Sequence, residues 1–562
     1  MAGRCAGAAI EGLKEKPRLS RRPAIVATAI VLIAAAVGTL AFVATRGAGG
    51  LRPPSFADET ATSGLEHTYD GPFAFATGGG VAAFDCDDDG KAELFVAGGT
   101  RPAALFRNRS PRGGALAFVL EPAPETDLED VTGAYPLDID SDGRTDLAVL
   151  REGENVLLRG LGSCRFERAN TRWSFDGRNE LSTAFSATWE GSAALPTLAV
   201  GNYLKLDATG DTTFDCDDNF FYRPESGGSR YQSPSVLKPG FCSLSMLFSD
   251  WDRSGRRDLR VSNDRQYYRG GEEQMWRIAP GEAPRVYTQQ DGWLRLEIWG
   301  MGIASEDLTG DGYPEVYLTS QADNKLQTLA GDAARPTYRD IALARGVTAT
   351  RPFTGDTALP STAWHPEFAD VNNDGYVDLF VSKGNVTAQE GFAIRDPSNL
   401  FIARSDGTFQ EGADKAGILN FDKGRGAALV DLNLDGLLDL VEVNYGGPTR
   451  IWRNLGAGDA ARPKAMGNWL QVRLRQRAPN VDAIGAWLEV RVGKAIRRRE
   501  LVVGGGHSGG QLGWTHFGLG SANRAEVRVT WPDRQTGEWQ PVDANQFVTI
   551  DRETGRPQVW QP

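Results

Sequence analysis

Residues 84–94 read FDCDDDGKAEL. Aspartate stands at the first, third and fifth positions of a loop that begins at Asp85, Gly90 follows at the sixth, and Glu93 stands at the ninth. Apolar residues flank the loop on both sides, as in a tight turn that joins two strands. One loop of this kind is most simply an exposed turn, whereas several at regular intervals indicate a repeated structural unit.

The loop recurs along the chain. Its copies begin at residues 85, 138, 250, 307, 370 and 431, so the starts lie 53, 112, 57, 63 and 61 residues apart. In the copy that begins at Asp250, Ser254 stands at the fifth position, where the other copies have an acid. The further copies read DIDSDGRTDL (138–147), DWDRSGRRDL (250–259), DLTGDGYPEV (307–316), DVNNDGYVDL (370–379) and DLNLDGLLDL (431–440).

The interval of 112 residues is twice the usual spacing and predicts a degenerate copy near residue 190. Residues 189–203, WEGSAALPTLAVGNY, carry an apolar strand at the expected place, but the loop has lost its acids, so we expect no metal there. Seven units of roughly 50–60 residues then fill residues 56–463. Repeats of this length with several short strands are typical of propeller blades. We therefore predict an all-β fold, a seven-bladed β-propeller.

The spacing of oxygen-bearing side chains in these loops predicts calcium. Carboxylate or amide oxygens at positions 1, 3, 5 and 9, with a backbone carbonyl near position 7, form the kind of hard oxygen set that Ca²⁺ prefers over zinc. An EF-hand is excluded, because its last acid falls at position 12 between helices. We expect up to six structural Ca²⁺ ions. Their predicted ligands are Asp85, Asp87, Asp89, Glu93, Asp138, Asp140, Asp142, Asp146, Asp250, Asp252, Ser254, Asp258, Asp307, Thr309, Asp311, Glu315, Asp370, Asn372, Asp374, Asp378, Asp431, Asn433, Asp435 and Asp439.

The pattern changes after the repeats. Residues 464–562 contain short apolar or alternating runs such as WLQVRLRQ, AWLEVRVG and EVRVTWP, separated by glycine and proline, which predicts a small C-terminal β domain. His507 in GGGHSGG and His516 in HFGLG suggest a metal site. Without a nearby acid or cysteine, however, two histidines are better explained as packing and loop residues.

These motifs resemble a known family. The repeated DxDxDGxxD loops between apolar strands are similar to the FG-GAP or VCBS repeats of integrin-α-like propellers. The segments NVDAIGAWLEV (480–490), RRRELVVGGGHSGGQ (497–511), HFGLG (516–520) and VRVTWPD (527–533) resemble the ASPIC/UnbV domain. The combination is similar to bacterial members of the cartilage acidic protein family. The resemblance implies a propeller over residues 56–463 and an ASPIC/UnbV-like domain over residues 464–562.

The N-terminus predicts a membrane anchor. Residues 24–45 are uncharged and apolar over a length that can cross a bilayer as a helix. The preceding tail, residues 1–23, is basic and should stay cytoplasmic, with residues 46–55 as a linker. We expect a single-pass protein of the cell membrane with its bulk extracytoplasmic. A cleaved signal peptide is the alternative, although its apolar region is usually shorter.

Charge and cysteines fit an exported protein. The formal net charge of −12 argues against a nucleic-acid partner. Oxidising compartments permit disulfides between Cys86, Cys164, Cys216 and Cys242, which allow three pairings. We favour Cys216 with Cys242, which would close an excursion rich in proline, serine and glycine, and therefore Cys86 with Cys164. Four buried free thiols are the alternative.

The face opposite the acidic loops is the predicted ligand face. It would bind a protein or glycan of the cell envelope, so we expect a binding, adhesion or scaffold module. The alternative is an extracytoplasmic hydrolase or lyase with its site in the central funnel, although no catalytic motif is present. A third possibility is that these side chains only cap the blades. The candidates are Asn202, Asn263, Asp264, Arg265, Lys325, His365, Lys383, Asn385 and Arg425.

Overall fold

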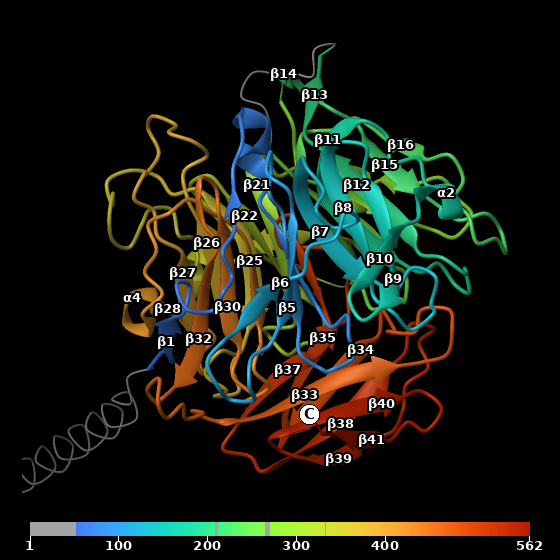
Figure 1. The fold of residues 1–562 in the computed structure, drawn as a ribbon. Coiled ribbons are helices and arrows are strands. Elements are labelled where there is room, and N and C mark those ends of the chain that lie inside the picture. Colours follow the sequence, from blue (N-terminus) through green and yellow to red (C-terminus); the bar gives the residue numbers. More distant parts are fainter. Residues whose placement is uncertain (1–51, 208–211, 265–269, 332, 562) are drawn as a thin grey trace, which may run out of the picture. The chain divides into compact units, whose positions relative to one another are not determined.

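A computed structural model describes residues 52–207, 212–264, 270–331 and 333–561. The regular secondary structure of these residues is almost wholly β-strand, with only short helical turns, which confirms the predicted all-β class (Figure 1). The predicted tail 1–23, anchor 24–45, most of the linker 46–55 and Arg265 lie outside the described residues. Within the described part, no helix has the length and apolar character needed to cross a membrane.

The repeats form seven four-stranded antiparallel units, and most of them are made of successive strands of the chain. The first two strands of each sheet are almost entirely buried, in keeping with the continuous apolar runs of the sequence, because neighbouring sheets cover both of their faces. The first four are sheet 1, β3 (Val81–Phe84), β4 (Glu93–Val96), β5 (Ala104–Asn108) and β6 (Phe118–Leu120); sheet 2, β7 (Val131–Leu137), β8 (Asp146–Gly153), β9 (Val156–Gly162) and β10 (Arg165–Arg168); sheet 3, β11 (Glu180–Thr188), β12 (Thr197–Asn202), β15 (Asn219–Tyr222) and β16 (Ser235–Leu237); and sheet 4, β17 (Ser243–Ser249), β18 (Asp258–Asn263), β19 (Gln274–Arg277) and β20 (Arg285–Val286).

The seventh sheet joins the two ends of the repeat region. Its fourth strand, β1, comes from the beginning of the described chain and pairs antiparallel with β32. The three sheets are sheet 5, β21 (Gly300–Glu306), β22 (Glu315–Ser320), β23 (Lys325–Leu329) and β24 (Tyr338–Asp340); sheet 6, β25 (Ala363–Ala369), β26 (Asp378–Lys383), β27 (Asn399–Ala403) and β28 (Phe409–Glu411); and sheet 7, β29 (Gly424–Val430), β30 (Asp439–Asn444), β32 (Arg450–Gly456) and β1 (Ser55–Asp58).

The first strands of the seven sheets contact one another in cyclic order, β3, β7, β11, β17, β21, β25, β29 and back to β3. No sheet closes on itself, and only β8 and β11 add a short pairing between neighbouring sheets among the described residues. The architecture is therefore propeller-like. Sheet 3 is the degenerate unit that the repeat spacing predicts near residue 190.

Apolar cores lie between neighbouring sheets. Phe221 of sheet 3 packs against Phe248 of sheet 4 with ring centroids 6.4 Å apart, and similar clusters occupy the other boundaries. Short elements complete the ring: β2 (Thr68–Tyr69), η1 (Phe73–Thr77), α2 (Asn170–Trp173), β13 (Leu204–Leu206), β14 (Thr212–Cys216), η2 (Gln289–Asp291), α3 (Ala342–Arg345), α4 (Ala413–Ala416) and β31 (Gly447–Pro448).

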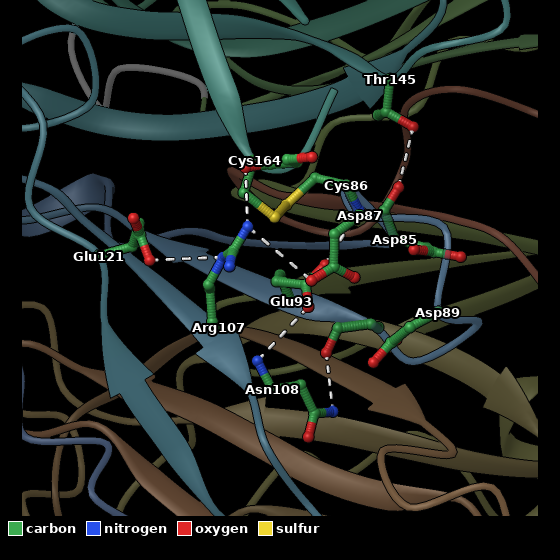
Figure 2. The surroundings of a disulfide bond; sticks show 12 residues. Asp85, Cys86, Asp87, Asp89, Glu93, Arg107, Asn108, Glu121, Thr145 and Cys164 are labelled. Atoms are coloured by element: carbon green, nitrogen blue, oxygen red, sulfur yellow. Dashed lines mark hydrogen bonds and ion pairs between the residues drawn. A yellow bond between two sulfur atoms is a disulfide. The ribbon is translucent and has the colours of Figure 1, made fainter. Parts of the chain in front are cut away.

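Both favoured disulfides are confirmed. Cys86, inside the first acidic loop, bonds to Cys164 in the turn between β9 and β10, and so ties sheet 1 to sheet 2 (Figure 2). Cys216 bonds to Cys242 and closes the excursion that leaves sheet 3. The alternative of free thiols at these four positions is excluded.

The C-terminal domain consists of two four-stranded sheets that enclose an apolar core of their own. A further strand, β36 (Gly510–Leu512), leaves the domain and pairs in parallel with β3 of sheet 1. The strands of the two sheets are β37 (Thr515–Gly520), β33 (Asn468–Arg475), β40 (Gln546–Asp551) and β41 (Pro557–Trp560), and β35 (Ala495–Glu500), β34 (Trp487–Val492), β38 (Arg524–Thr530) and β39 (Gln540–Asp543).

Candidate metal centres and the domain that covers them

Each acidic loop joins the first and second strands of its sheet, and the six share one backbone conformation. The fourth and sixth residues have positive φ in every loop, for example 62° at Asp88 and 85° at Gly90. In every loop the glycine N–H at position 6 donates to the carboxylate at position 1. The N···O distances are 3.0 Å for Gly90, 2.8 Å for Gly143, 2.8 Å for Gly255, 3.1 Å for Gly312, 2.8 Å for Gly375 and 2.8 Å for Gly436.

The acid at position 9 is the first residue of the second strand, and in several loops it accepts hydrogen bonds both from the loop and from the third strand. In loop 2, the Asp146 carboxylate accepts N–H groups from Ile139 at 2.7 Å and from Gly160 of β9 at 2.7 Å, one on each oxygen. Asp378 and Asp439 follow the same pattern. One donor on each oxygen leaves lone pairs free for a cation.

The buried carboxylates are poised for a positive partner. Burial, together with the nearby Asp87 and Asp85, raises the pKa of Glu93 to about 8. Burial and the neighbouring Asp374 raise the pKa of Asp370 to about 8. Several acids within a few ångströms of one another repel, and a divalent cation would remove that repulsion.

Unpaired oxygens show where a cation fits. In loop 1 (Figure 2), one ligand oxygen each from Asp85, Asp87 and Glu93 lies within 4.8 Å of the others. Asp138, Asp140 and Asp146 of loop 2 have the same arrangement. Buried oxygens without a hydrogen-bond partner fall on the predicted ligands at positions 1 and 3. They are Asp85 Oδ1, Asp87 Oδ1, Asp140 Oδ1, Asp307 Oδ1 and Asn433 Oδ1. The donor sets of loops 1, 2, 4 and 6 therefore suit Ca²⁺, and loop 5 carries the same oxygen set. In loop 2, Arg159 pairs with Asp140 and Asp142, but it leaves Asp140 Oδ1 and the position-9 acid Asp146 without an ion pair in the described part of the chain.

Loop 3, where an ion is predicted at Asp250, Asp252, Ser254 and Asp258, has side-chain contacts that do not fit calcium. The Arg256 guanidinium binds Asp258, with Nε 2.9 Å from Oδ1, and also reaches Asp252. Asp258 further accepts hydrogen bonds from Ile278 N–H, Trp251 Nε1 and Tyr287 Oη. These donors occupy both oxygens, and the arginine supplies the positive charge that a metal would bring.

The C-terminal domain covers the acidic loops, which sequence reasoning did not predict. It contacts every loop through a polar interaction, so the loops are bridges between the repeat sheets and this domain. The contacts are Arg473 Nη2 to Asp85 at 3.5 Å, Asn480 N–H to Ser141 Oγ at 2.9 Å, Arg257 Nη2 to Gly485 O at 2.7 Å, Arg498 Nη1 to Asp307 at 2.9 Å, His516 Nε2 to Asn373 Oδ1 at 2.6 Å and Gln471 Nε2 to Asp431 at 2.6 Å.

A glycine-rich stretch of the C-terminal domain, residues 503–512, lies at the centre of the ring; we call it the central segment. It bridges the first strands of sheets 1–5 in turn. The His507 N–H donates to His365 Nδ1 of sheet 6 at 3.1 Å, and Gln511 Nε2 donates to Glu367 at 2.8 Å. The His507 ring is fully buried, 5.1 Å from the Trp364 ring. The central segment thus pairs with the first strands around the ring axis, and a cavity of about 240 Å³ lined by His365, Glu367 and this segment remains beside it.

The residues predicted for a ligand face are mostly buried and bonded within the repeat sheets. Asn202 and Asn263 donate to backbone carbonyls of their own sheets, and Lys383 pairs with Asp396 at 2.8 Å. Lys325 pairs with Asp340 at 3.4 Å. These partners suit blade capping, so their role as a ligand face stays a prediction. The members that are buried are Asn202, Asn263, His365, Lys383, Asn385 and Arg425.

Asp264 and Arg425 have unusual surroundings within this set. Asp264 accepts a hydrogen bond from Tyr203 Oη at 2.7 Å, and burial raises its pKa to about 6. The Arg425 guanidinium donates only to backbone carbonyls and lies 4.1 Å from the centre of the Trp364 ring. Burial lowers the pKa of Arg425 to about 9. Arg425 thus helps to hold the ring together beside the central segment.

Comparisons with family models identify both parts of the chain. Residues 85–149 and 307–381 match the FG-GAP-like repeat, and residues 476–557 match the ASPIC and UnbV domain. The chain is 28% identical to cartilage acidic protein 1 of Mus musculus over 166 residues, which is 29% of this chain and 24% of that protein. It is 27% identical to the Xenopus tropicalis protein over 231 residues, 39% and 34% of the two chains. The chain is thus a homologue that spans about a quarter to a third of these relatives.

Solved structures with a similar fold are distant in sequence. An Agrocybe aegerita lectin described as recognising non-reducing terminal N-acetylglucosamine is 15% identical, covers 62% of this chain and 86% of its own, and has a TM-score of 0.37. Saccharomyces cerevisiae Sqt1 is 11% identical, covers 86% and 100%, and has a TM-score of 0.37. An exotype rhamnogalacturonan lyase, YesX, is 11% identical, covers 88% and 84%, and has a TM-score of 0.33.

Proposed function

We propose that this chain is an extracytoplasmic scaffold or adhesion module: a seven-bladed propeller whose acidic loops bind structural Ca²⁺ and whose ASPIC and UnbV domain is locked onto those loops. The observation that carries this proposal is the set of buried, unpartnered oxygens at ligand positions, in loops that each contact the C-terminal domain. Residues 24–45 would anchor the module in the cell membrane.

Calcium would hold the loops and the docked domain together. Loops 1, 2, 4, 5 and 6 supply oxygen sets, so up to five ions are proposed in place of six. Arg473, Arg498 and Gln471 each bind Oδ2 of a position-1 aspartate, the oxygen that also accepts the glycine N–H of the loop, and so help to fix that carboxylate. Loss of the ions would leave carboxylates that repel one another where the loops meet the C-terminal domain. Both the loops and the docked domain would then be less stable.

A binding module fits the centre of the ring better than an enzyme does. His365 is the histidine of the predicted ligand face; its Nδ1 accepts the His507 N–H and its Nε2 lies 3.4 Å from Glu367. Both ring nitrogens of His365 thus have protein partners, and a cavity of about 240 Å³ lined by His365 and Glu367 remains beside the central segment. A protein or glycan of the cell envelope is the proposed partner, engaged by the outer surface.

The test is to count bound calcium. We would express residues 53–562, dialyse the protein against Ca²⁺ and measure the metal by elemental analysis, before and after treatment with EDTA. The proposal expects several Ca²⁺ ions per chain, a lower Tm in EDTA and faster proteolysis at the boundary between the ring and the C-terminal domain. A metal-free protein whose melting curve does not respond to EDTA would refute the calcium role.

A further inference from the structure

Loop 3 differs from the other acidic loops in its arginines. Its sequence, DWDRSGRRDL, places arginine at positions 253, 256 and 257. Arg256 turns inward and neutralises Asp252 and Asp258. Arg253 and Arg257 instead meet the C-terminal domain, where the Arg253 guanidinium lies 3.9 Å from the centre of the Trp487 ring.

A cavity of about 370 Å³ lies between this loop and the β34–β38 sheet. Its lining carries four arginines and two acids, a formal charge of +2. The volume is within the range of small-molecule sites. We call it the arginine pocket; the residues that define it are Arg253, Arg257, Trp487, Arg528, Trp531 and Arg534.

The polar atoms left without a partner in this pocket are all donors. Arg253 Nη1, Arg257 Nε and Trp487 Nε1 are buried and have no hydrogen-bond acceptor among the described residues. The Trp487 side chain is only 2% exposed. Loops 1 and 2 show the reverse, since their unpartnered atoms are carboxylate oxygens. Unpartnered acceptors indicate a cation, and unpartnered donors around excess positive charge indicate an anion.

The acids of the lining are already engaged. Glu489 accepts Arg498 Nε at 2.9 Å and Arg528 Nε at 2.5 Å, one on each oxygen. Asp250 accepts the Gly255 N–H at 2.8 Å. Arg253, Arg257 and Arg534 make no ion pair with any described residue. Three guanidinium groups therefore face the pocket without a direct ion pair, although the carboxylates of Asp250 and Glu500 are near enough to attract Arg257.

We propose that the arginine pocket binds the oxyanion group of a small acidic ligand, a sulfate, phosphate or carboxylate. Planar guanidinium groups bind such oxyanions through paired N–H donors, and Trp487 Nε1 adds a neutral donor. The Arg253–Trp487 stack and the bonds from Arg257 Nη2 to the Gly485 and Pro532 carbonyls hold the donors in place before the ligand arrives. The site goes beyond the calcium-dependent scaffold role, because it lies at the loop that does not fit calcium.

The experiment uses residues 53–562 in Ca²⁺, titrated with sodium sulfate, phosphate or glucuronate and, at equal ionic strength, with sodium chloride. Isothermal titration calorimetry and tryptophan fluorescence report binding. We expect saturable binding of at least one oxyanion, and the tightest of the three identifies the group. Arg253→Gln should weaken it by about tenfold or more, because charge-assisted hydrogen bonds are lost.

Two further variants keep the test decisive. Trp487→Phe removes one N–H donor and keeps the aromatic ring under Arg253, so it should weaken binding by a smaller factor without unfolding the protein. Arg524→Gln alters an exposed arginine outside the pocket, 69% exposed and paired with Asp543, and should leave affinity unchanged. The proposal is overturned if the three oxyanions give no more heat than chloride, or if Arg253→Gln and Trp487→Phe bind as the wild type does.

Discussion

Trp469 of the C-terminal domain lies directly against Gly436, the glycine of the sixth acidic loop. A Cβ atom built on Gly436 would come within 1.9 Å of Trp469 Cε2. Gly90 of the first loop stands in the same relation to Trp560, with 2.1 Å to Cη2. The glycine in these loops therefore meets two demands, since its φ is positive and an aromatic ring of the docked domain takes the place of a side chain.

Gly436→Ala should destabilise the protein more than Gly143→Ala. Both glycines occupy position 6 with similar φ, 83° and 87°, but nothing lies within 4 Å of a Cβ built on Gly143. The control should cost about 1–2 kcal/mol from backbone strain alone. Gly436→Ala adds displacement of the Trp469 ring and should lower the Tm further, as measured by thermal unfolding in Ca²⁺. Equal losses in the two variants would mean that the contact between the domains adds little stability.

The repeat spacing alone predicts the number of sheets, because each unit carries its own loop and strands. Even sheet 3, whose loop has lost its acids, is located by the interval between Asp138 and Asp250. The pattern could not predict which loops bind metal. Arg256 of loop 3 follows the motif glycine in sequence, but its contact with Asp258 and the further donors on that carboxylate become visible only once the third strand is in place.

Asp140→Asn should remove one bound Ca²⁺ ion, whereas Asp252→Asn should not. Both residues stand at position 3 of their loops. Asp140 keeps a buried Oδ1 without a partner, although its Oδ2 pairs with Arg159 at 2.6 Å, while Asp252 is near the Arg256 guanidinium, which also pairs with the position-9 acid Asp258. The measurement is the number of Ca²⁺ ions per chain after equilibrium dialysis, with the Tm in calcium and in EDTA as a second readout. If Asp252→Asn lost an ion, loop 3 would have to be counted as a calcium site.

The double variant Cys86→Ala/Cys164→Ala should lower stability more than Cys216→Ala/Cys242→Ala. The first disulfide closes 78 residues and joins two sheets of the ring, and the second closes a 26-residue excursion. A cross-link that closes a longer loop constrains the unfolded chain more, so we expect a loss of about 2–5 kcal/mol for the first pair. Chemical denaturation in Ca²⁺ compares the two variants. A larger loss for the second pair would indicate that the excursion, and not the link between sheets, limits stability.

The central segment illustrates what the sequence could not reveal. GGGHSGG was noted for its histidine, and the interpretation of His507 as a packing residue agrees with its complete burial. Its partners, however, lie far away in the chain: His365 is 142 residues distant, and Ser508 Oγ reaches the Thr183 carbonyl 325 residues away. Local patterns predict strands and turns, but they carry no signal for contacts at such separations.

A fall in pH should destabilise the folded protein at the central segment, because His507 is buried there in its neutral form. Burial, and then the nearby Arg425 and His365, lower the pKa of His507 to about 3, compared with 6.5 for an ordinary histidine. The unfolded chain therefore binds a proton below pH 6.5 that the folded chain refuses, so the stabilising contribution is complete above pH 6.5 and is lost as the pH falls. At about pH 5 the loss of folding free energy should approach about 2 kcal/mol.

The variant His507→Phe tests this prediction. It keeps a ring against Trp364 but cannot bind the proton, so its Tm should fall less than that of the wild type between about pH 7.5 and pH 5 in Ca²⁺. Parallel losses of Tm in the two proteins would assign the acid sensitivity to other groups.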